Sequence, residues 1–97
     1  MGKISRTRGK NVELAVARYM GCRRNHFERE DLSYPILSIE VKHRRAVAKM
    51  LVTAMAQAEA AAPDGKVPVV VLHEERQPYA EAFAMMRLRD LREIVGD

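Results

Sequence analysis

The sequence lacks the features that mark disulfide-rich, zinc-binding or membrane-spanning proteins. Cys22 is its one cysteine, so no disulfide can form within the chain, which fits a reducing cytoplasm. A zinc site would depend mostly on His26, His43 and His73, whose spacing matches no common zinc pattern. No apolar run approaches the ~18 residues of a membrane span. No apolar segment of a signal peptide follows the first residues. We therefore expect a cytoplasmic protein.

The length of 97 residues predicts one domain, residues 1–97, with a small core. Oligomerisation is a common remedy for the limited stability of so small a domain. Apolar residues make up 47% of the chain, which is enough for it to fold and excludes a disordered tail. Residues 1–7 are interpreted as a mobile basic N-terminal segment, and no repeat or linker divides the rest.

The charge is distributed unevenly along the chain. Residues 1–49 hold 12 Lys/Arg and 5 Asp/Glu, a net charge of +7, whereas residues 50–97 hold 5 and 8, a net charge of −3. Lysine and arginine bind phosphates by Coulomb attraction and counterion release, so a nucleic acid is the first partner to consider for the basic half. A solvated basic surface without a partner is the alternative, and charge alone does not separate the two.

The spacing of apolar residues predicts three helices, from about residue 7 to 20, from 46 to 62 and from 89 to 95. Gly21 ends the first helix, and Pro63-Asp64-Gly65 ends the second. The expected apolar stripes are Val12, Ala15, Val16 and Tyr19 on the first helix, and Val47, Leu51, Ala54, Met55 and Ala58 on the second.

Strands are predicted at 22–27, 36–42, 67–72 and 82–88, with a turn at 28–35 and a polar loop at 74–81. The resulting order is αββαββα. The expected architecture is a mixed β-sheet flanked by helices, in the α/β class.

The strand at 36–42 carries the residues of greatest chemical interest. Its side chains alternate, so Ser38, Glu40 and Lys42 share one face while the other face is apolar. Two residues along a strand span about 6–7 Å, and at that separation a carboxylate and an ammonium could hold a phosphate, a hydrated metal ion and a water between them. Mg²⁺ binds carboxylate oxygens, waters and substrate phosphate, and it lowers the pKa of a bound water. The ammonium could orient that water or stabilise the transition state.

An isolated Glu-x-Lys on one strand face is usually only a solvated ion pair. Three features favour a functional site here. Asp31 lies nine residues before Glu40 and could supply the second carboxylate; His43, Arg44 and Arg45 follow Lys42 directly; and a helix containing a Glu precedes the strands.

Asp31 followed by Glu40-Val41-Lys42 at the end of an apolar strand resembles the PD-(D/E)XK motif of restriction-endonuclease-like nucleases. Within that superfamily, Glu13 in the first helix and Gln57 in the helix after the motif match accessory active-site positions of the archaeal-type Holliday junction resolvases. The similarity extends over roughly residues 8–92, and it is greatest to small phage-encoded members. It implies a restriction-endonuclease-like fold. It also implies that the protein acts in the cytoplasm of a bacterium or of a phage-infected host cell.

The resemblance implies a role for each matching residue. Asp31, Glu40 and the backbone carbonyl of Val41 would ligate Mg²⁺, for which Mn²⁺ could substitute, and Lys42 would activate or position water. Glu13 would hold a metal-bound water or a second metal, and Gln57 would orient the phosphate or Lys42. The remaining basic residues would contact the DNA backbone: Arg6, Arg8, Lys10, His43, Arg44 and Arg45.

The chain departs from the family pattern around Asp31. Glu30 stands where the motif has proline, so Glu30 is a rival for the role of upstream ligand. The resemblance implies an endonuclease that resolves four-way DNA junctions. A chain with one active site can cut one strand, and a junction needs two symmetric cuts, so we expect a homodimer. The alternatives are another nuclease of the same fold, such as a nicking or flap-cutting repair enzyme, and a non-catalytic DNA-binding module.

Overall fold

The computed structural model describes residues 2–21, 23–24, 32–34 and 36–96 of the chain. In that part the chain is an α/β protein that divides into two compact units, residues 1–45 and 46–97, and each unit is described by itself. The prediction of the α/β class is confirmed. The expectation that the two halves form one domain stays a prediction.

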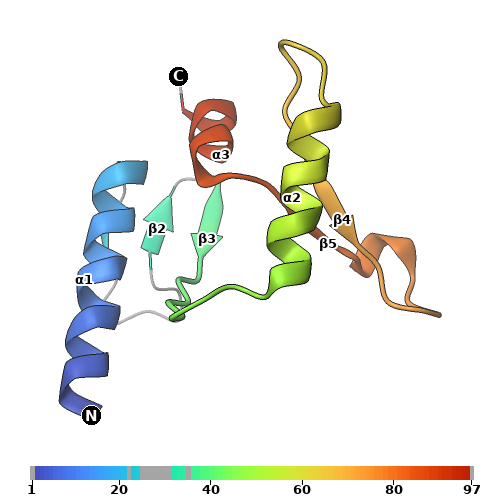
Figure 1. Ribbon diagram of the computed structural model, residues 1–97. Helices are drawn as coiled ribbons and strands as arrows, with labels where there is room; N and C mark the ends of the chain where they lie inside the picture. Colours follow the sequence, from blue (N-terminus) through green and yellow to red (C-terminus); the bar gives the residue numbers. More distant parts are fainter. Residues whose placement is uncertain (1, 22, 25–31, 35, 97) are drawn as a thin grey trace. The chain divides into compact units, whose positions relative to one another are not determined.

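The first unit is a helix followed by an antiparallel sheet (Figure 1). Helix α1 (Gly2–Met20) begins earlier than the expected Thr7. It ends at Gly21, whose φ of 73° is the left-handed conformation that glycine adopts without strain. The helix contacts β1 (Arg23–Arg24). Strand β1 pairs with β2 (Leu32–Tyr34), and β2 pairs with β3 (Leu37–Ile39).

The strand β2 falls in the segment that was expected to be a turn, so that prediction is wrong for residues 32–34. Leu32-Ser33-Tyr34 is short and has no long alternating pattern, and its pairing with β3 supplies the backbone hydrogen bonds that stabilise it. The predicted strand at 36–42 is confirmed only over Leu37–Ile39. Glu40 and Lys42 therefore lie just beyond the ladder rather than within it.

The second unit contains two helices and a two-stranded sheet (Figure 1). Its elements are α2 (Lys49–Ala61), β4 (Val70–Leu72), the short 3-10 helix η1 (Tyr79–Glu81), β5 (Phe83–Met85) and α3 (Leu88–Val95). Helix α2 contacts β4, which pairs with β5 in antiparallel fashion. All strand pairs in the described part of the chain are antiparallel, in two separate sheets. The mixed sheet that was expected is not present among these residues.

Helix α2 packs its predicted apolar stripe inward, with one exception. Met55 is buried, with 4% of its surface exposed, and Leu51, Ala54 and Ala58 are half-buried around it. Val47 precedes the helix and is exposed, so its place in the stripe was wrong. Beyond the helix, Lys66 N–H donates to the carbonyl of Pro63 at 3.1 Å, and the turn needs Gly65 at a φ of 82°.

The stripe of α1 is rotated relative to the prediction. Ala17 and Met20 are buried, whereas Ala15 and Tyr19, which were expected to face the core, are exposed. Glu13 is half-buried, Ala17 follows it by four residues, and Met20 follows Ala17 by three. Residues at these spacings lie on one face of a helix. Tyr19 was misplaced because the expected stripe is shifted by about one residue from the face that contains the buried Ala17 and Met20.

Candidate functional site

Glu40 and Lys42 form an ion pair at the end of β3. The Lys42 Nζ lies 3.3 Å from the Glu40 Oε2, and the two side chains are 75% and 57% exposed respectively. The expected gap of 6–7 Å between their end groups is therefore wrong for this structure. Both side chains are long and face solvent, so their opposite charges bring the end groups together. The backbone spacing still places them on one side of the chain.

The alternation predicted for this segment continues past the end of the ladder. Leu37, Ile39 and Val41 are half-buried, and the residues between and after them, Ser38, Glu40 and Lys42, are exposed. The apolar face therefore anchors the segment while both charged side chains remain accessible from solvent. An exposed ion pair of this kind contributes about 0–1 kcal/mol, so the two groups can separate at little cost.

The register of the hairpin defines which positions lie opposite one another. Leu32 pairs with Ile39, Ser33 with Ser38, and Tyr34 with Leu37. Ile39 directly precedes Glu40 in the sequence, and Leu32 directly follows Asp31. Asp31 and its rival Glu30 lie outside the described residues.

Glu13 lies on the inward face of α1. It precedes the buried Ala17 by four residues and Met20 by seven, and a helix brings residues at these spacings to one side. The side chain of Glu13 thus belongs to the buried side of α1. Arg6, Arg8 and Lys10 belong to the same helix, nearer its N-terminus.

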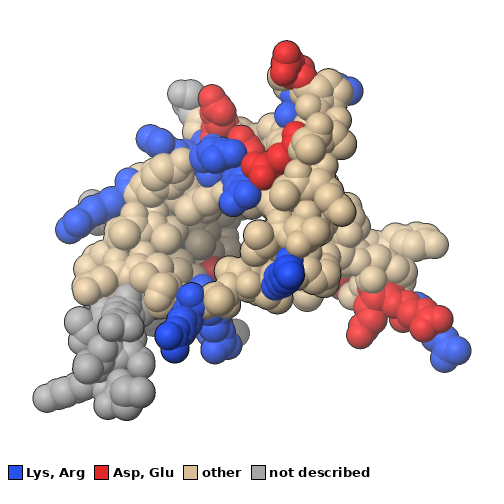
Figure 2. All heavy atoms as spheres, viewed as in Figure 1, with Lys and Arg blue, Asp and Glu red and all other residues tan. Residues whose placement is uncertain are grey.

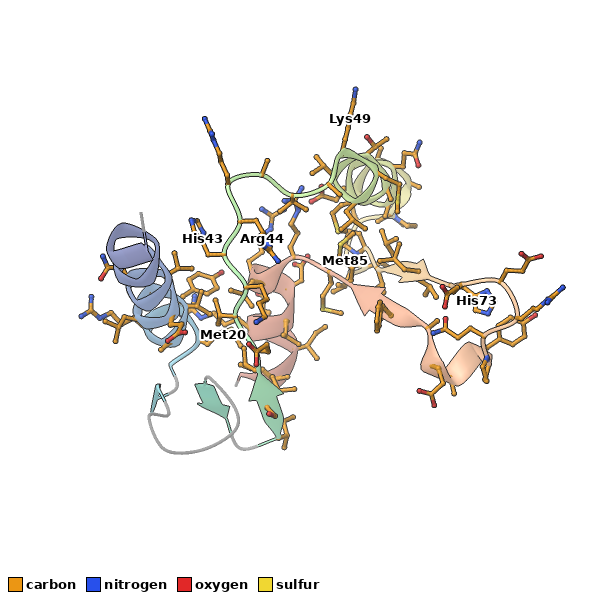
Figure 3. All side chains as sticks on the ribbon, turned by 90° about the horizontal axis from the view of Figure 1, so that it is seen from below. Met20, His43, Arg44, Lys49, His73 and Met85 are labelled. Atoms are coloured by element: carbon orange, nitrogen blue, oxygen red, sulfur yellow. The ribbon has the colours of Figure 1, made fainter. Side chains whose placement is uncertain are left out.

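A run of exposed cations follows Glu40. His43, Arg44 and Arg45 are all exposed, and they occupy the irregular segment between β3 and α2. Figure 3 labels His43 and Arg44 in this segment, and it shows Lys49 extending into solvent from the first turn of α2. Exposed cationic side chains on an irregular segment can extend to the phosphates of a DNA backbone, and such contacts depend mainly on charge.

Gln57 belongs to the second unit, on α2, where it is exposed. Its placement relative to Glu40 is not defined, because the two residues belong to different units.

Among the described residues, no group of three or more His, Cys, Asp and Glu side chains converges as a metal site would require. Neither does any helix in that part of the chain have the length and apolar character needed to cross a membrane.

Sequence reasoning missed a cluster around Glu59, at the C-terminal end of α2. Arg87 donates to both carboxylate oxygens of Glu59, from Nη2 at 2.9 Å and from Nε at 3.2 Å, and Arg89 Nη2 donates to Oε2 at 3.1 Å. The hydrogen bonds that Arg87 donates to Glu59 lower the pKa of Glu59 and raise the pKa of Arg87. Arg87 and Arg89 follow Glu59 by 28 and 30 residues, so no local sequence pattern predicts these contacts.

His73, to which no role was assigned, helps to order the loop between β4 and β5 (Figure 3). Its Nε2 donates to the backbone carbonyl of Gln77 at 2.7 Å, and its ring lies 4.9 Å from that of Tyr79. The side chain of Gln77 accepts from the Glu74 N–H and donates to the Glu81 carbonyl. These contacts are structural, and they give His73 no part in the candidate site.

Comparison with known proteins found no relative of this chain. The chain matches no family model, and neither a curated protein nor a solved structure was found to match it. The function of the chain must therefore be inferred from its own residues.

Proposed function

We propose that the chain is a Mg²⁺-dependent endodeoxyribonuclease with a restriction-endonuclease-like fold, and that its substrate is the four-way DNA junction. The observation that carries the proposal is the exposed pair of side chains at the end of β3, where the Lys42 Nζ lies 3.3 Å from the Glu40 Oε2. Asp31, which lies outside the described residues, would supply a second carboxylate, and two carboxylates can share one cation.

The donor set fits magnesium. Mg²⁺ takes oxygen ligands, commonly one or two carboxylates with waters and substrate phosphate. The Glu40 carboxylate is accessible at the end of β3, and it would hold the ion together with Asp31 and the carbonyl of Val41. When bound, the ion would neutralise phosphate charge and lower the pKa of a coordinated water.

Lys42 would change partners when DNA binds. Its Nζ contacts Glu40 at 3.3 Å in the free protein, and a scissile phosphate would offer it a more highly charged acceptor. An ammonium held beside the phosphate can orient the attacking water or stabilise the charge that develops in the transition state. Glu13, on the inward face of α1, would hold a further water, and Gln57 would orient the phosphate or Lys42.

The cations around the site would supply affinity rather than chemistry. His43, Arg44 and Arg45 are exposed directly after the candidate site, and Arg6, Arg8 and Lys10 lie on α1. Contacts of this kind neutralise phosphates and position the duplex without reading sequence. A homodimer would present two such surfaces, which matches the two-fold symmetry of a junction that needs two symmetric cuts.

The test is Mg²⁺-dependent cleavage of a four-way junction, compared with duplex, flap and single-stranded DNA. A resolvase cuts the junction at paired symmetric positions and leaves the other substrates largely intact. Preferential cutting of a flap or nicking of a duplex would favour another nuclease of the same fold. Binding without any cleavage would favour the non-catalytic DNA-binding module.

A further inference from the structure

Helix α2 is held from one side at two places along its length. Met55 is buried in the small core of the second unit. Glu59, one turn later, is fixed by Arg87 and Arg89. Residues four apart lie on the same face of a helix, so both contacts act on a single side of α2. Acidic and basic side chains adjoin over the neighbouring ends of α2 and α3 in the space-filling view (Figure 2).

Gln57 lies on the opposite side of the helix. It is two residues from both Met55 and Glu59, and two residues turn an α-helix by about 200°. The exposures agree with this geometry, since Gln57 is exposed while Met55 is buried and Glu59 half-buried. Any rotation of α2 about its axis would therefore swing Gln57 through the same angle.

The contacts at Glu59 are suited to resisting such a rotation. A guanidinium that donates two hydrogen bonds to one carboxylate has a defined direction as well as a defined distance. A second guanidinium, from Arg89, binds the same carboxylate at 3.1 Å. Both arginines lie at the junction of β5 and α3, so the contact joins the end of α2 to a part of the sheet and to the next helix. Met55, the one buried residue of α2, is an unbranched side chain that can adapt its shape to a rotated helix.

We infer that Glu59, together with Arg87 and Arg89, is a positioning residue that fixes the rotation of α2 and thereby the direction in which Gln57 projects. The inference rests on the proposed function for the role of Gln57, but the clamp itself involves only residues of the second unit. Glu59 touches no reacting atom. Its effect on catalysis should therefore pass entirely through Gln57.

A double-mutant cycle tests that path. Glu59→Gln keeps the shape of the side chain and removes its charge, so we expect it to lower kcat for junction cleavage by roughly 3–10-fold with KM changed less than about 2-fold. In a Gln57→Ala background the same change should have almost no further effect, because two residues that act through one path are not additive. Glu75→Gln, on the exposed turn between β4 and β5, is the matched control and should leave kcat unchanged. Equal losses from Glu59→Gln in both backgrounds would overturn the inference and leave Glu59 a purely stabilising residue.

A distance measurement tests the clamp independently of activity. In a Cys22→Ser chain, spin labels attached at Gln57→Cys on α2 and at Glu93→Cys on α3 report the rotation of one helix relative to the other. We expect a narrow distance distribution that broadens or shifts with Glu59→Gln and stays unchanged with Glu75→Gln. An unchanged distribution with Glu59→Gln would overturn the inference even if cleavage is lost. If the wild-type chain cleaves no DNA, the proposed function fails, and the labelled distances still decide whether Glu59 sets the rotation of α2.

Discussion

Leu32 lies opposite Ile39 in the antiparallel hairpin of the first unit, and each of these residues is next in sequence to a candidate metal ligand. Asp31 precedes one and Glu40 follows the other. Asp31 lies outside the described residues, so the proposal that it and Glu40 hold one metal ion is tested by substitution of the two carboxylates.

The first prediction concerns the upstream ligand. Asp31→Asn should lower the cleavage rate by at least about 100-fold, since even partners that only support a ligand change activity by 10–100-fold. Junction binding should persist, because the cations that contact phosphate remain. Glu30→Gln is the matched control and should cleave almost normally. Cleavage by Asp31→Asn with loss in Glu30→Gln would assign the ligand role to Glu30.

The second prediction separates Lys42 from the cations that follow it. Lys42→Ala should lower kcat by about 10²–10³-fold, the usual effect of removing a transition-state donor, with little change in affinity. The double variant Arg44→Ala with Arg45→Ala should weaken binding and reduce the slope of log K against log salt by roughly 0.9 per lost phosphate contact. Measurement of single-turnover cleavage and salt-dependent binding distinguishes the two effects. Identical behaviour would make Lys42 one more backbone contact.

The third prediction uses the core of the second unit. Met55→Ala should lower the free energy of unfolding by about 2–5 kcal/mol, the usual range for a buried methionine, because Met55 is 4% exposed. Met50→Ala, on the same helix at 64% exposure, should change it by less than ~0.5 kcal/mol. Urea denaturation of both variants measures the difference. Equal losses would mean that α2 does not pack through Met55.

The fourth prediction is a dependence of stability on acid pH that originates at Glu59. Its pKa is lowered in the folded chain by the hydrogen bond from Arg87, relative to an ordinary value of 4.5. A lowered folded-state pKa contributes stability that is fully present above about 4.5 and is lost as the pH falls through the folded-state pKa. Thermal melting between pH 7 and pH 3 should show this loss. Glu59→Gln should melt with a weaker acid dependence, while Glu75→Gln should retain that of the wild type.

The fifth prediction is a homodimer whose interface comes from the second half of the chain. Val71 and Phe83 in the β4–β5 sheet are 66% and 72% exposed, and Val52 on α2 is also exposed. Exposed apolar residues in such number favour burial against a partner. Light scattering at micromolar concentration should give about twice the mass of one chain. The substitution Val71→Asp should reduce the measured mass to that of a single chain. A mass near 11.0 kDa for the wild type, with junction cleavage intact, would contradict the symmetry argument.

Local patterns were sufficient for part of the fold. The helix ends at Gly21 and before Pro63 were predictable, because each depends on the conformational preference of one or two residues. The exposure of Glu40 and Lys42 followed from simple alternation along the strand. Strand β2 was missed, because three residues carry too little periodicity and depend on a partner strand for their hydrogen bonds.

The features that escaped prediction depend on contacts between distant residues. Glu59 contacts Arg87 across 28 residues of sequence, and the face of α1 that is buried at Ala17 and Met20 could not be assigned from the spacing of apolar residues alone. The close approach of Lys42 to Glu40 was missed for a different reason. A strand pattern fixes where side chains leave the backbone, but the end groups of long exposed side chains follow their mutual attraction.

The most direct test of the central claim is cleavage of a labelled four-way junction by the wild-type chain and by Glu40→Gln, with Mg²⁺ and with EDTA. The account predicts paired symmetric cuts by the wild type that require Mg²⁺ or Mn²⁺, no cuts by Glu40→Gln, and equal binding of the junction by both proteins. Binding of the junction by the wild type without cleavage of any DNA substrate, in either metal ion, would contradict it.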